Sequence, residues 1–337
     1  MNIERESMTW LTQQLTDTTH DISYSNLAEV EFDEKGKPTT SWMKNWTQEQ
    51  RTAKFFEFCN AYDKRQDSLL AENYQQFSHR LHWHECPFVD VVSKYNDPFT
   101  ILNACLLFSF TNEHWLTFLA WQDGREEGMK ARFDTGARHA RSDLFQIYYP
   151  KDTDVKEWLL TGPKKAAEAM KDMFDYRSRP YTMMECAKLF NHYFTSEQGF
   201  RNAMYPCKNA ARHIAMSHPE LVDPESFLHG GTGFFDGLSQ VMACPNYMSK
   251  AKYSIDGYGE YKPLNKACID FYESMVYLCN HPDNPIQKQK FLNVEDKLCF
   301  FYKHIAIRNG IKQTTKQIPY DWVYPRNWSL RTGEYDA

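Results

Sequence analysis

A run of glycines in the second half of the chain restricts the fold more than any other feature of the sequence. Gly231, Thr232 and Gly233 form a short hairpin, and Gly237 follows at the start of an apolar helical pattern. Glycine adopts backbone conformations that other residues avoid, so this stretch predicts a tight turn that leads into a helix. Two interpretations stay open: the turn joins two packed helices, or its N–H groups bind one phosphate of a nucleic acid.

Apolar residues recur at helical spacing along most of the chain and strand-like alternation is scarce, which predicts a mainly α fold. Residues 97–121 are apolar nearly all round and begin with Asp97 and a proline, a helix-start signal. We therefore expect a central buried helix or helix pair there. Asn112, Glu113 and His114 interrupt the run, either as satisfied core groups or as the lining of a pocket.

Shorter patterns predict other helices and one loop. Thr47 and Gln50 stand three residues apart, as in a capping box, and a helix is expected to follow. Residues 182–194 and 199–217 also show helical spacing. Residues 124–141 contain three glycines and five Lys or Arg, which predicts a mobile basic loop. The helix expected over 199–217 carries four basic side chains: Arg201, Lys208, Arg212 and His213.

The distribution of charge and motifs suggests three parts. The net charge is −5, but residues 1–40 hold eight acids against three bases, and residues 286–331 hold nine Lys or Arg against three acids. A basic region of this kind suits a polyanionic partner. We expect an acidic N-terminal arm over 1–40, a helical domain over 41–218, and a half over 219–337 that contains the hairpin and ends in a basic, aromatic tail.

The cysteine spacing and the hydropathy of the sequence indicate the redox state of the thiols and argue against a membrane span. The nine cysteines include no C-x-x-C pair, and no apolar run approaches the roughly 18 residues of a membrane span. We expect reduced thiols, no membrane partner and a cytoplasmic location. His82, His84 and Cys86 lie close together, but structural zinc needs four ligands and no second cluster follows. No metal site is predicted.

A hairpin followed by a carboxylate resembles the helix-hairpin-helix DNA glycosylase superfamily. The carboxylate here is Asp256, 23 residues after Gly233. The resemblance implies an all-helical fold that places this carboxylate near the sugar of an extruded nucleotide. Lyase-type members carry a Schiff-base lysine two residues past the second hairpin glycine. Phe235 occupies that position in this sequence, so the resemblance implies that lyase chemistry has been lost.

Three segments give a closer resemblance. They read G-T-G-F-F-D-G-L-S-Q-V, D-G-Y-G-E-Y-K-P-L-N and V-E-D-K-L-C-F-F-Y-K, in this order. They are similar to the phage α-glutamyl/putrescinyl thymine pyrophosphorylases, also called amino acid:DNA transferases, a divergent branch of the same superfamily. The resemblance covers about residues 41–312. It implies a transferase that acts on double-stranded DNA carrying 5-pyrophosphoryloxymethyluracil and displaces pyrophosphate with the amine of an amino acid or polyamine.

The resemblance also implies roles for particular residues. Such a site must hold the base out of the stack, neutralise the leaving pyrophosphate and deprotonate the incoming amine. The candidate catalytic residues are Asp256 as general base or amine-orienting carboxylate, Glu295 as the second carboxylate, and Lys303, which holds the leaving group with Lys250 or Lys252. The candidate DNA-binding residues are Gly231, Thr232, Gly233, Lys250 and Lys252. No organic cofactor is implied, and a monovalent cation at the hairpin is left open.

Two alternative functions follow from the same residues. A monofunctional DNA glycosylase acting on a modified base would use Asp256 to activate water or to stabilise the cationic sugar. A non-enzymatic DNA-binding protein would use the hairpin only to hold phosphate. The three functions differ in product: a modified nucleoside, an abasic site, or unchanged DNA.

Overall fold

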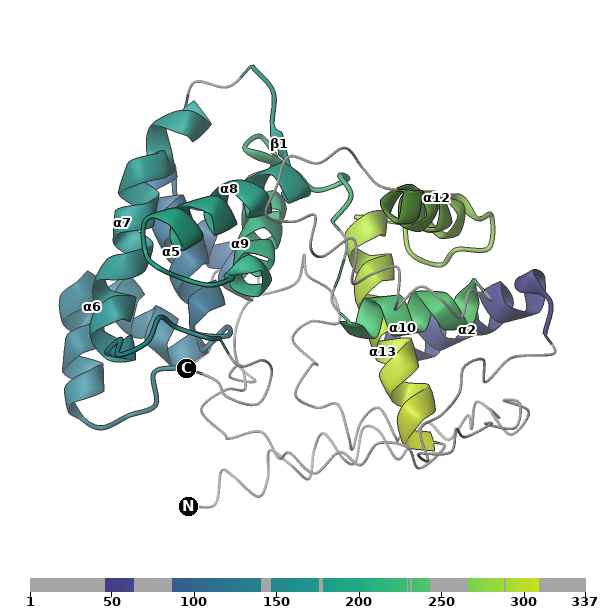
Figure 1. Cartoon of the computed structure of the whole chain (residues 1–337), viewed down its shortest axis with the longest axis horizontal. Helices are drawn as coiled ribbons and strands as arrows, with labels where there is room; N and C mark the ends of the chain where they lie inside the picture. The colour runs from purple at the N-terminus through teal and green to yellow at the C-terminus, as the bar shows by residue number, and fades with distance from the viewer. Residues whose placement is uncertain are drawn as a thin grey trace. The chain divides into compact units, whose positions relative to one another are not determined.

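The computed structural model is mainly helical, as the apolar spacing predicts (Figure 1). The residues that it describes are 46–63, 87–140, 147–175, 178–228, 230, 232–242, 266–287 and 289–308. The acidic arm and the aromatic tail expected from the sequence lie outside these ranges. Contacts within the chain divide it into two compact units, and each is described by itself.

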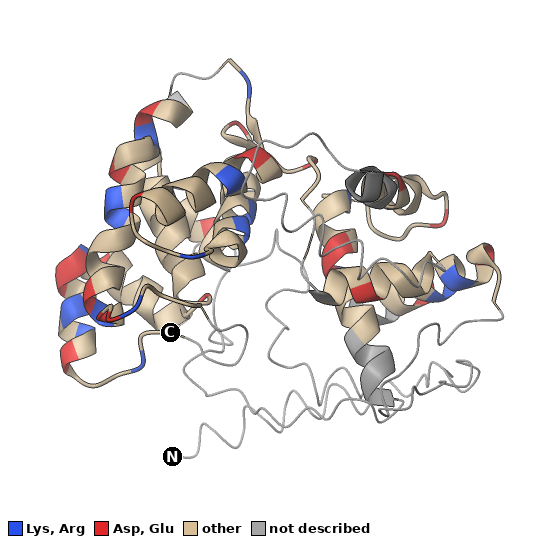
Figure 2. Cartoon of the chain, in the orientation of Figure 1, with Lys and Arg blue, Asp and Glu red and all other residues tan. Residues whose placement is uncertain are grey.

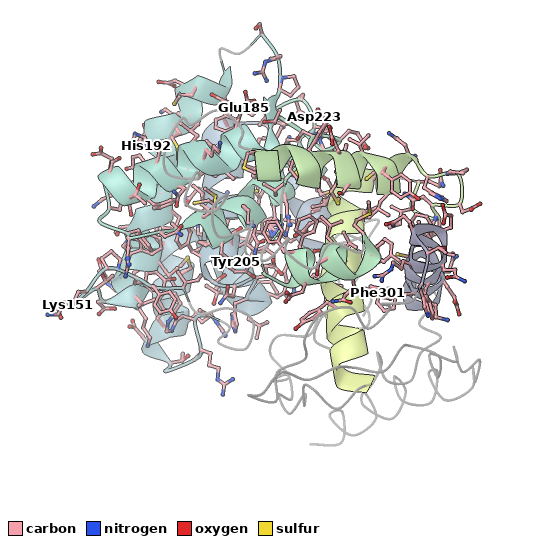
Figure 3. The ribbon with its side chains drawn as sticks, turned by 45° about the vertical axis from the view of Figure 1, so that its right-hand side comes forward. Lys151, Glu185, His192, Tyr205, Asp223 and Phe301 are labelled. Atoms are coloured by element: carbon pink, nitrogen blue, oxygen red, sulfur yellow. The ribbon has the colours of Figure 1, made fainter. Side chains whose placement is uncertain are left out.

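The first unit consists of four described helices. They are α2 (Gln48–Asp63), α10 (Thr232–Val241), α12 (Lys266–Asn280) and α13 (Lys290–Arg308). The boundary expected at residue 218 separates α2 from the other three, whereas the contacts join them. The physical reason is an aromatic core. The rings of Phe55 and Phe58 lie 5.6 and 5.3 Å from the ring of Phe301 on α13, which is labelled in Figure 3.

Helix α2 begins at the capping box that the sequence predicts. The Gln50 backbone N–H donates to Thr47 Oγ1 at 3.2 Å, and the Thr47 N–H donates to Gln50 Oε1 at 2.9 Å. One turn later, the buried guanidinium of Arg51 donates to the carbonyl oxygen of Gln240 at 2.7 Å. Gln48 donates to the carbonyl of Val241 at 2.9 Å. The last carbonyl groups of a helix have no partner within the helix and carry a partial negative charge. The guanidinium of Arg51 and the side-chain amide of Gln48 therefore cap the C-terminal end of α10.

Replacing Arg51 with methionine is expected to lower the free energy of unfolding by about 2 kcal/mol, because its hydrogen bonds to the carbonyl oxygens of Trp46 and Gln240 are lost while the apolar bulk is kept. Urea denaturation measures the change. The control is Lys54→Met on the same helix. Lys54 pairs with Glu57 at 2.7 Å, and that glutamate is half exposed, so this variant should lose less than about 1 kcal/mol. Equal losses in the two variants would contradict the capping role of Arg51.

The second unit contains six described helices and two short strands. The helices are α4 (Pro87–Val92), α5 (Pro98–Phe110), α6 (Trp115–Asp134), α7 (Val155–Asp175), α8 (Met183–Ser196) and α9 (Met204–Ser217). The strands β1 (Tyr181–Thr182) and β2 (Val222–Asp223) pair in parallel, with Tyr181 opposite Val222 and Thr182 opposite Asp223. A capping box formed by Thr182 and Glu185 starts α8 directly after β1.

Helix α5 is the central buried helix predicted over 97–121. Asp97 is its N-cap and accepts a hydrogen bond from the Thr100 N–H at 2.8 Å. Every residue from Ile101 to Phe110 is buried, because α5 packs against both α7 and α9. The helix then ends in a turn, and α6 begins after His114, whose side chain caps it. The expected helix pair is therefore α5 and the start of α6.

The prediction of a loop over residues 124–141 is wrong for most of that range, because α6 continues through it. Arg125 has a φ of 55° and kinks the helix, and its guanidinium carbon lies 4.2 Å from the centre of the Trp121 ring. After the kink, Met129 and Phe133 are buried four residues apart. This short apolar stripe holds the second half of α6 in helical form despite its glycines and charges.

The bases of this region stand beside acids. Figure 2 shows Lys and Arg interspersed with Asp and Glu along α6 and α7. One such pair joins the two helices, with Lys164 Nζ 3.4 Å from Glu126 Oε1. These helices therefore do not present a surface of one charge sign, and they do not support a phosphate clamp of the kind that a basic loop could form.

The described helices are too short or too polar to span a membrane, and the described cysteines lie mostly in the core. None of these helices combines the length and apolar composition that a membrane span requires. Of the cysteines whose side chains are described, all except Cys299 are buried. They occupy core positions, as expected for reduced thiols that act as small apolar side chains.

Candidate functional site

The first unit brings together two of the three segments that carry the family resemblance. The segment over 231–241 includes all of α10, and the segment over 294–303 lies within α13. The two helices pack against each other. A β-carbon added at Gly237 would overlap the backbone oxygen of Leu298, and one added at Gly233 would press on Cys299 Sγ. These glycines therefore allow the two helices to approach more closely than any larger side chain would permit.

A buried carboxylate lies at the beginning of this contact. Gly230 stands two residues before α10, and a β-carbon there would overlap Glu295 Oε1. Glu295 is 4% exposed. The unpaired N–H groups at the start of a helix carry a partial positive charge that attracts anions. The turn that could have held a phosphate thus has a carboxylate of the protein beside it, and α10 has an anion near its start as well as a cation at its end.

The structure describes only some of the residues predicted for the site. Glu295 and Gly233 lie on facing sides of the contact between α13 and α10, as the glycine geometry shows. Thr232 is the first residue of α10 and Lys303 belongs to α13, but their side chains lie outside the described part. The remaining predicted residues also lie outside it: Gly231, Lys250, Lys252 and Asp256.

Sequence reasoning missed one polar contact in this region, between Asp236 on α10 and Tyr302 on α13. The pKa of Tyr302 is raised to about 12, mainly by burial and then by the charge of Asp236 and its hydrogen bond with the phenol. The signal was present in the sequence, since both residues belong to the segments that carry the resemblance. Their pairing could not be found there because it depends on which faces of the two helices meet.

The raised pKa of Tyr302 predicts a loss of stability at high pH. The folded state favours the neutral phenol, so its contribution is fully present below pH 10, the usual pKa, and is lost as the pH rises through about 12. Urea unfolding between pH 9 and 12 should show a shallower loss of stability in Tyr302→Phe than in the unchanged protein. The exposed Tyr277 gives a control, and Tyr277→Phe should leave the slope unchanged. Equal slopes in all three proteins would contradict the contact.

Other groups on α13 are buried as well. Asn293, Asp296 and Lys297 are 5, 7 and 2% exposed, so charged residues of both signs are withdrawn from water on this helix. Burying charges costs free energy unless they are paired or hydrogen-bonded. The burial of these side chains indicates that α13 carries a packed polar surface.

Neither a search for metal-binding groups nor comparison with known proteins assigns a function to these residues. Within the described ranges, no group of three or more His, Cys, Asp or Glu side chains is placed to hold a metal ion. His82, His84 and Cys86 lie outside those ranges. Comparison with models of protein families, with curated proteins and with solved structures found no match for this chain.

Proposed function

We propose that this protein is a transferase that acts on double-stranded DNA, with a helix-hairpin-helix glycosylase-like fold. Its reaction would displace pyrophosphate from 5-pyrophosphoryloxymethyluracil with the amine of an amino acid or polyamine. The observation that carries the proposal is the contact between α10 and α13. It joins two separate segments of the family resemblance, and it buries the carboxylate of Glu295 at Gly230. A mainly helical fold is also what the resemblance requires.

The proposed reaction forms one bond and breaks one bond. The amine nitrogen attacks the exocyclic methylene carbon of the base, a C–N bond forms, and the C–O bond to pyrophosphate breaks. Pyrophosphate leaves with the electron pair of that bond, and the nitrogen loses a proton to a carboxylate, either Asp256 or Glu295. Lys303, with Lys250 or Lys252, would neutralise the leaving group. The base must leave the helical stack for this attack to occur.

Within the proposal, the DNA backbone is contacted by the hairpin and by two lysines: Gly231, Thr232, Gly233, Lys250 and Lys252. Gly233 also packs against α13, where an added β-carbon would press on Cys299 Sγ. A monovalent cation at the hairpin would add positive charge for a phosphate.

Mass spectrometry of nucleosides distinguishes the proposal from its alternatives. The protein is incubated with duplex DNA that contains 5-pyrophosphoryloxymethyluracil and with a pool of amino acids and polyamines, and the DNA is then digested. The proposal predicts a thymidine derivative whose mass has lost pyrophosphate and gained one amine. Abasic sites would instead identify a glycosylase, and unchanged nucleosides with every amine would leave only DNA binding.

A further inference from the structure

One histidine of the second unit has a hydrogen-bond acceptor at each of its ring nitrogens. His218 is the C-cap of α9, and it is 6% exposed. Its Nδ1 lies 2.8 Å from Glu220 Oε1, and its Nε2 lies 3.0 Å from the carbonyl oxygen of Val92, the last residue of α4. An ionised carboxylate and a backbone carbonyl accept hydrogen bonds and donate none. Both N–H groups for these contacts must therefore come from the imidazole.

The two contacts together require a proton on each ring nitrogen. A neutral imidazole has one N–H group, so it donates to one acceptor and turns a lone pair toward the other. The protonated ring donates to both acceptors. Burial opposes a charged ring, but the carboxylate of Glu220 and the negative end of α9 favour it. The geometry around His218 is therefore that of an imidazolium.

The other charged groups on α9 and on the elements packed against it do not contact this ring. Those elements are α4, α5, α8 and β2. Their carboxylates have other partners: Asp90 lies near Lys94, Asp97 accepts from the Thr100 N–H, Glu185 pairs with Arg179, and Asp223, labelled in Figure 3, accepts from the Glu225 N–H. The bases of α8 and α9 are Lys188, His192, Lys208, Arg212 and His213. Among the described residues, Glu220 is the one titratable group that hydrogen-bonds or pairs with the His218 ring.

His218 joins two elements that stand far apart in the sequence. Helix α4 is the first described helix of the segment 82–228, and β2 is the last described strand of that segment. The carbonyl oxygen of His218 accepts from the N–H groups of Leu221 and Val222, at 2.9 and 3.2 Å, and so forms the turn that leads into β2. The residue therefore holds α4 through its ring and β2 through its backbone. Loss of a ring contact would loosen this junction.

We propose that His218 is a pH-sensitive latch that joins α4 to the turn before β2 in the second unit. The protonated ring binds Val92 and Glu220 together and closes the latch. When the ring gives its proton to water, a lone pair faces one of the two acceptors, and the side chain of Glu220, which is 64% exposed, can turn into solvent. Histidine changes its charge between about pH 5 and 8. The latch is therefore closed at the acidic end of this range and loosened at the other end.

The latch lies within the second unit and does not depend on the transferase function. Its consequence is local: as the pH rises, the end of α4 and the turn over 219–221 open more often, while the helices of the same unit that do not contact the ring keep their stability.

Urea unfolding of the full chain at about pH 5.5 and about pH 8 tests the latch, because these values lie on the two sides of the histidine range. His218→Gln keeps an amide donor but cannot be charged. It should raise the equilibrium constant for unfolding roughly tenfold at the lower pH, where a charged hydrogen bond is lost, and by a much smaller factor at the higher pH. In a Glu220→Gln background, the effect of His218→Gln should depend much less on pH.

The matched control is His192→Gln on α8, an exposed histidine of the same unit that is labelled in Figure 3. Its effect on the unfolding constant should be the same at both pH values. An effect of His218→Gln that is equally independent of pH would overturn the proposal.

Amide hydrogen exchange of the unchanged protein tests the latch even if the variants fail to fold. Protection is expressed relative to an unstructured chain at the same pH, which removes the effect of pH on exchange itself. Peptides that cover α4 and residues 218–223 should lose protection as the pH rises across the histidine range, whereas a peptide from α8 should keep it. Constant protection in α4 and the turn, or an equal loss in α8, would overturn the proposal.

Discussion

Replacing Gly237 with alanine is expected to destabilise the first unit by about 2 kcal/mol, although the same change usually stabilises a helix. In an exposed helix, Gly→Ala gains up to about 1 kcal/mol. At Gly237 the new β-carbon would overlap the backbone oxygen of Leu298, which cannot move as the end of a side chain can. The helices α10 and α13 must separate, and overpacking of this kind costs about 1 to 3 kcal/mol.

The matched control for this variant is Gly124→Ala in α6. A β-carbon at Gly124 would meet no atom within 4 Å, so the substitution should be neutral or slightly stabilising. Thermal or urea denaturation of the two variants therefore tests the sign of the effect as well as its size. A Gly237→Ala protein that is as stable as Gly124→Ala would show that α10 and α13 are not in close backbone contact.

Replacing Glu295 with glutamine is expected to slow transfer to DNA by at least about a hundredfold, the usual contribution of a positioned acid or base. Glutamine keeps the size of the side chain at Gly230 and its ability to hydrogen-bond, but it cannot take a proton from the amine. The rate of formation of the modified nucleoside measures the effect, and the urea midpoint separates lost chemistry from lost folding.

The control for this variant is Glu273→Gln on α12, where the side chain is exposed. It changes the net charge of the first unit by the same amount and should leave the rate unchanged. Comparison with Asp256→Asn then assigns the two carboxylates. A Glu295→Gln protein that turns over normally, while Asp256→Asn does not, would show that Glu295 only neutralises the start of α10.

The sequence predicts helices well where local chemistry determines them. Asp97 begins α5, and Thr47 and Gln50 begin α2, because a cap acts within three or four residues of its own position. The course of α6 could not be predicted in the same way. It depends on the packing of Met129 and Phe133, which are buried four residues apart after the kink at Arg125.

Contacts between distant segments could not be read from the sequence. Arg51 and Gln240 are 189 positions apart, and their contact, with that of Gln48 and Val241, shows that α2 belongs with α10. From the sequence, the glycine motif could be either a turn between packed helices or a phosphate-binding turn. The geometry at Gly233 and Gly237 favours close helix packing. Similarly, the spacing of Lys208 and Arg212 fits a solvated face, and only the packing around α9 shows that they are buried.

The most direct test of the proposed chemistry is the stoichiometry of pyrophosphate release. The protein is mixed with duplex DNA containing 5-pyrophosphoryloxymethyluracil, with and without the amine pool, and released pyrophosphate is counted against the modified nucleoside formed. Displacement by an amine predicts one pyrophosphate for each new C–N bond and no release without an amine. Release that proceeds equally without an amine, or no release at all, would contradict the account.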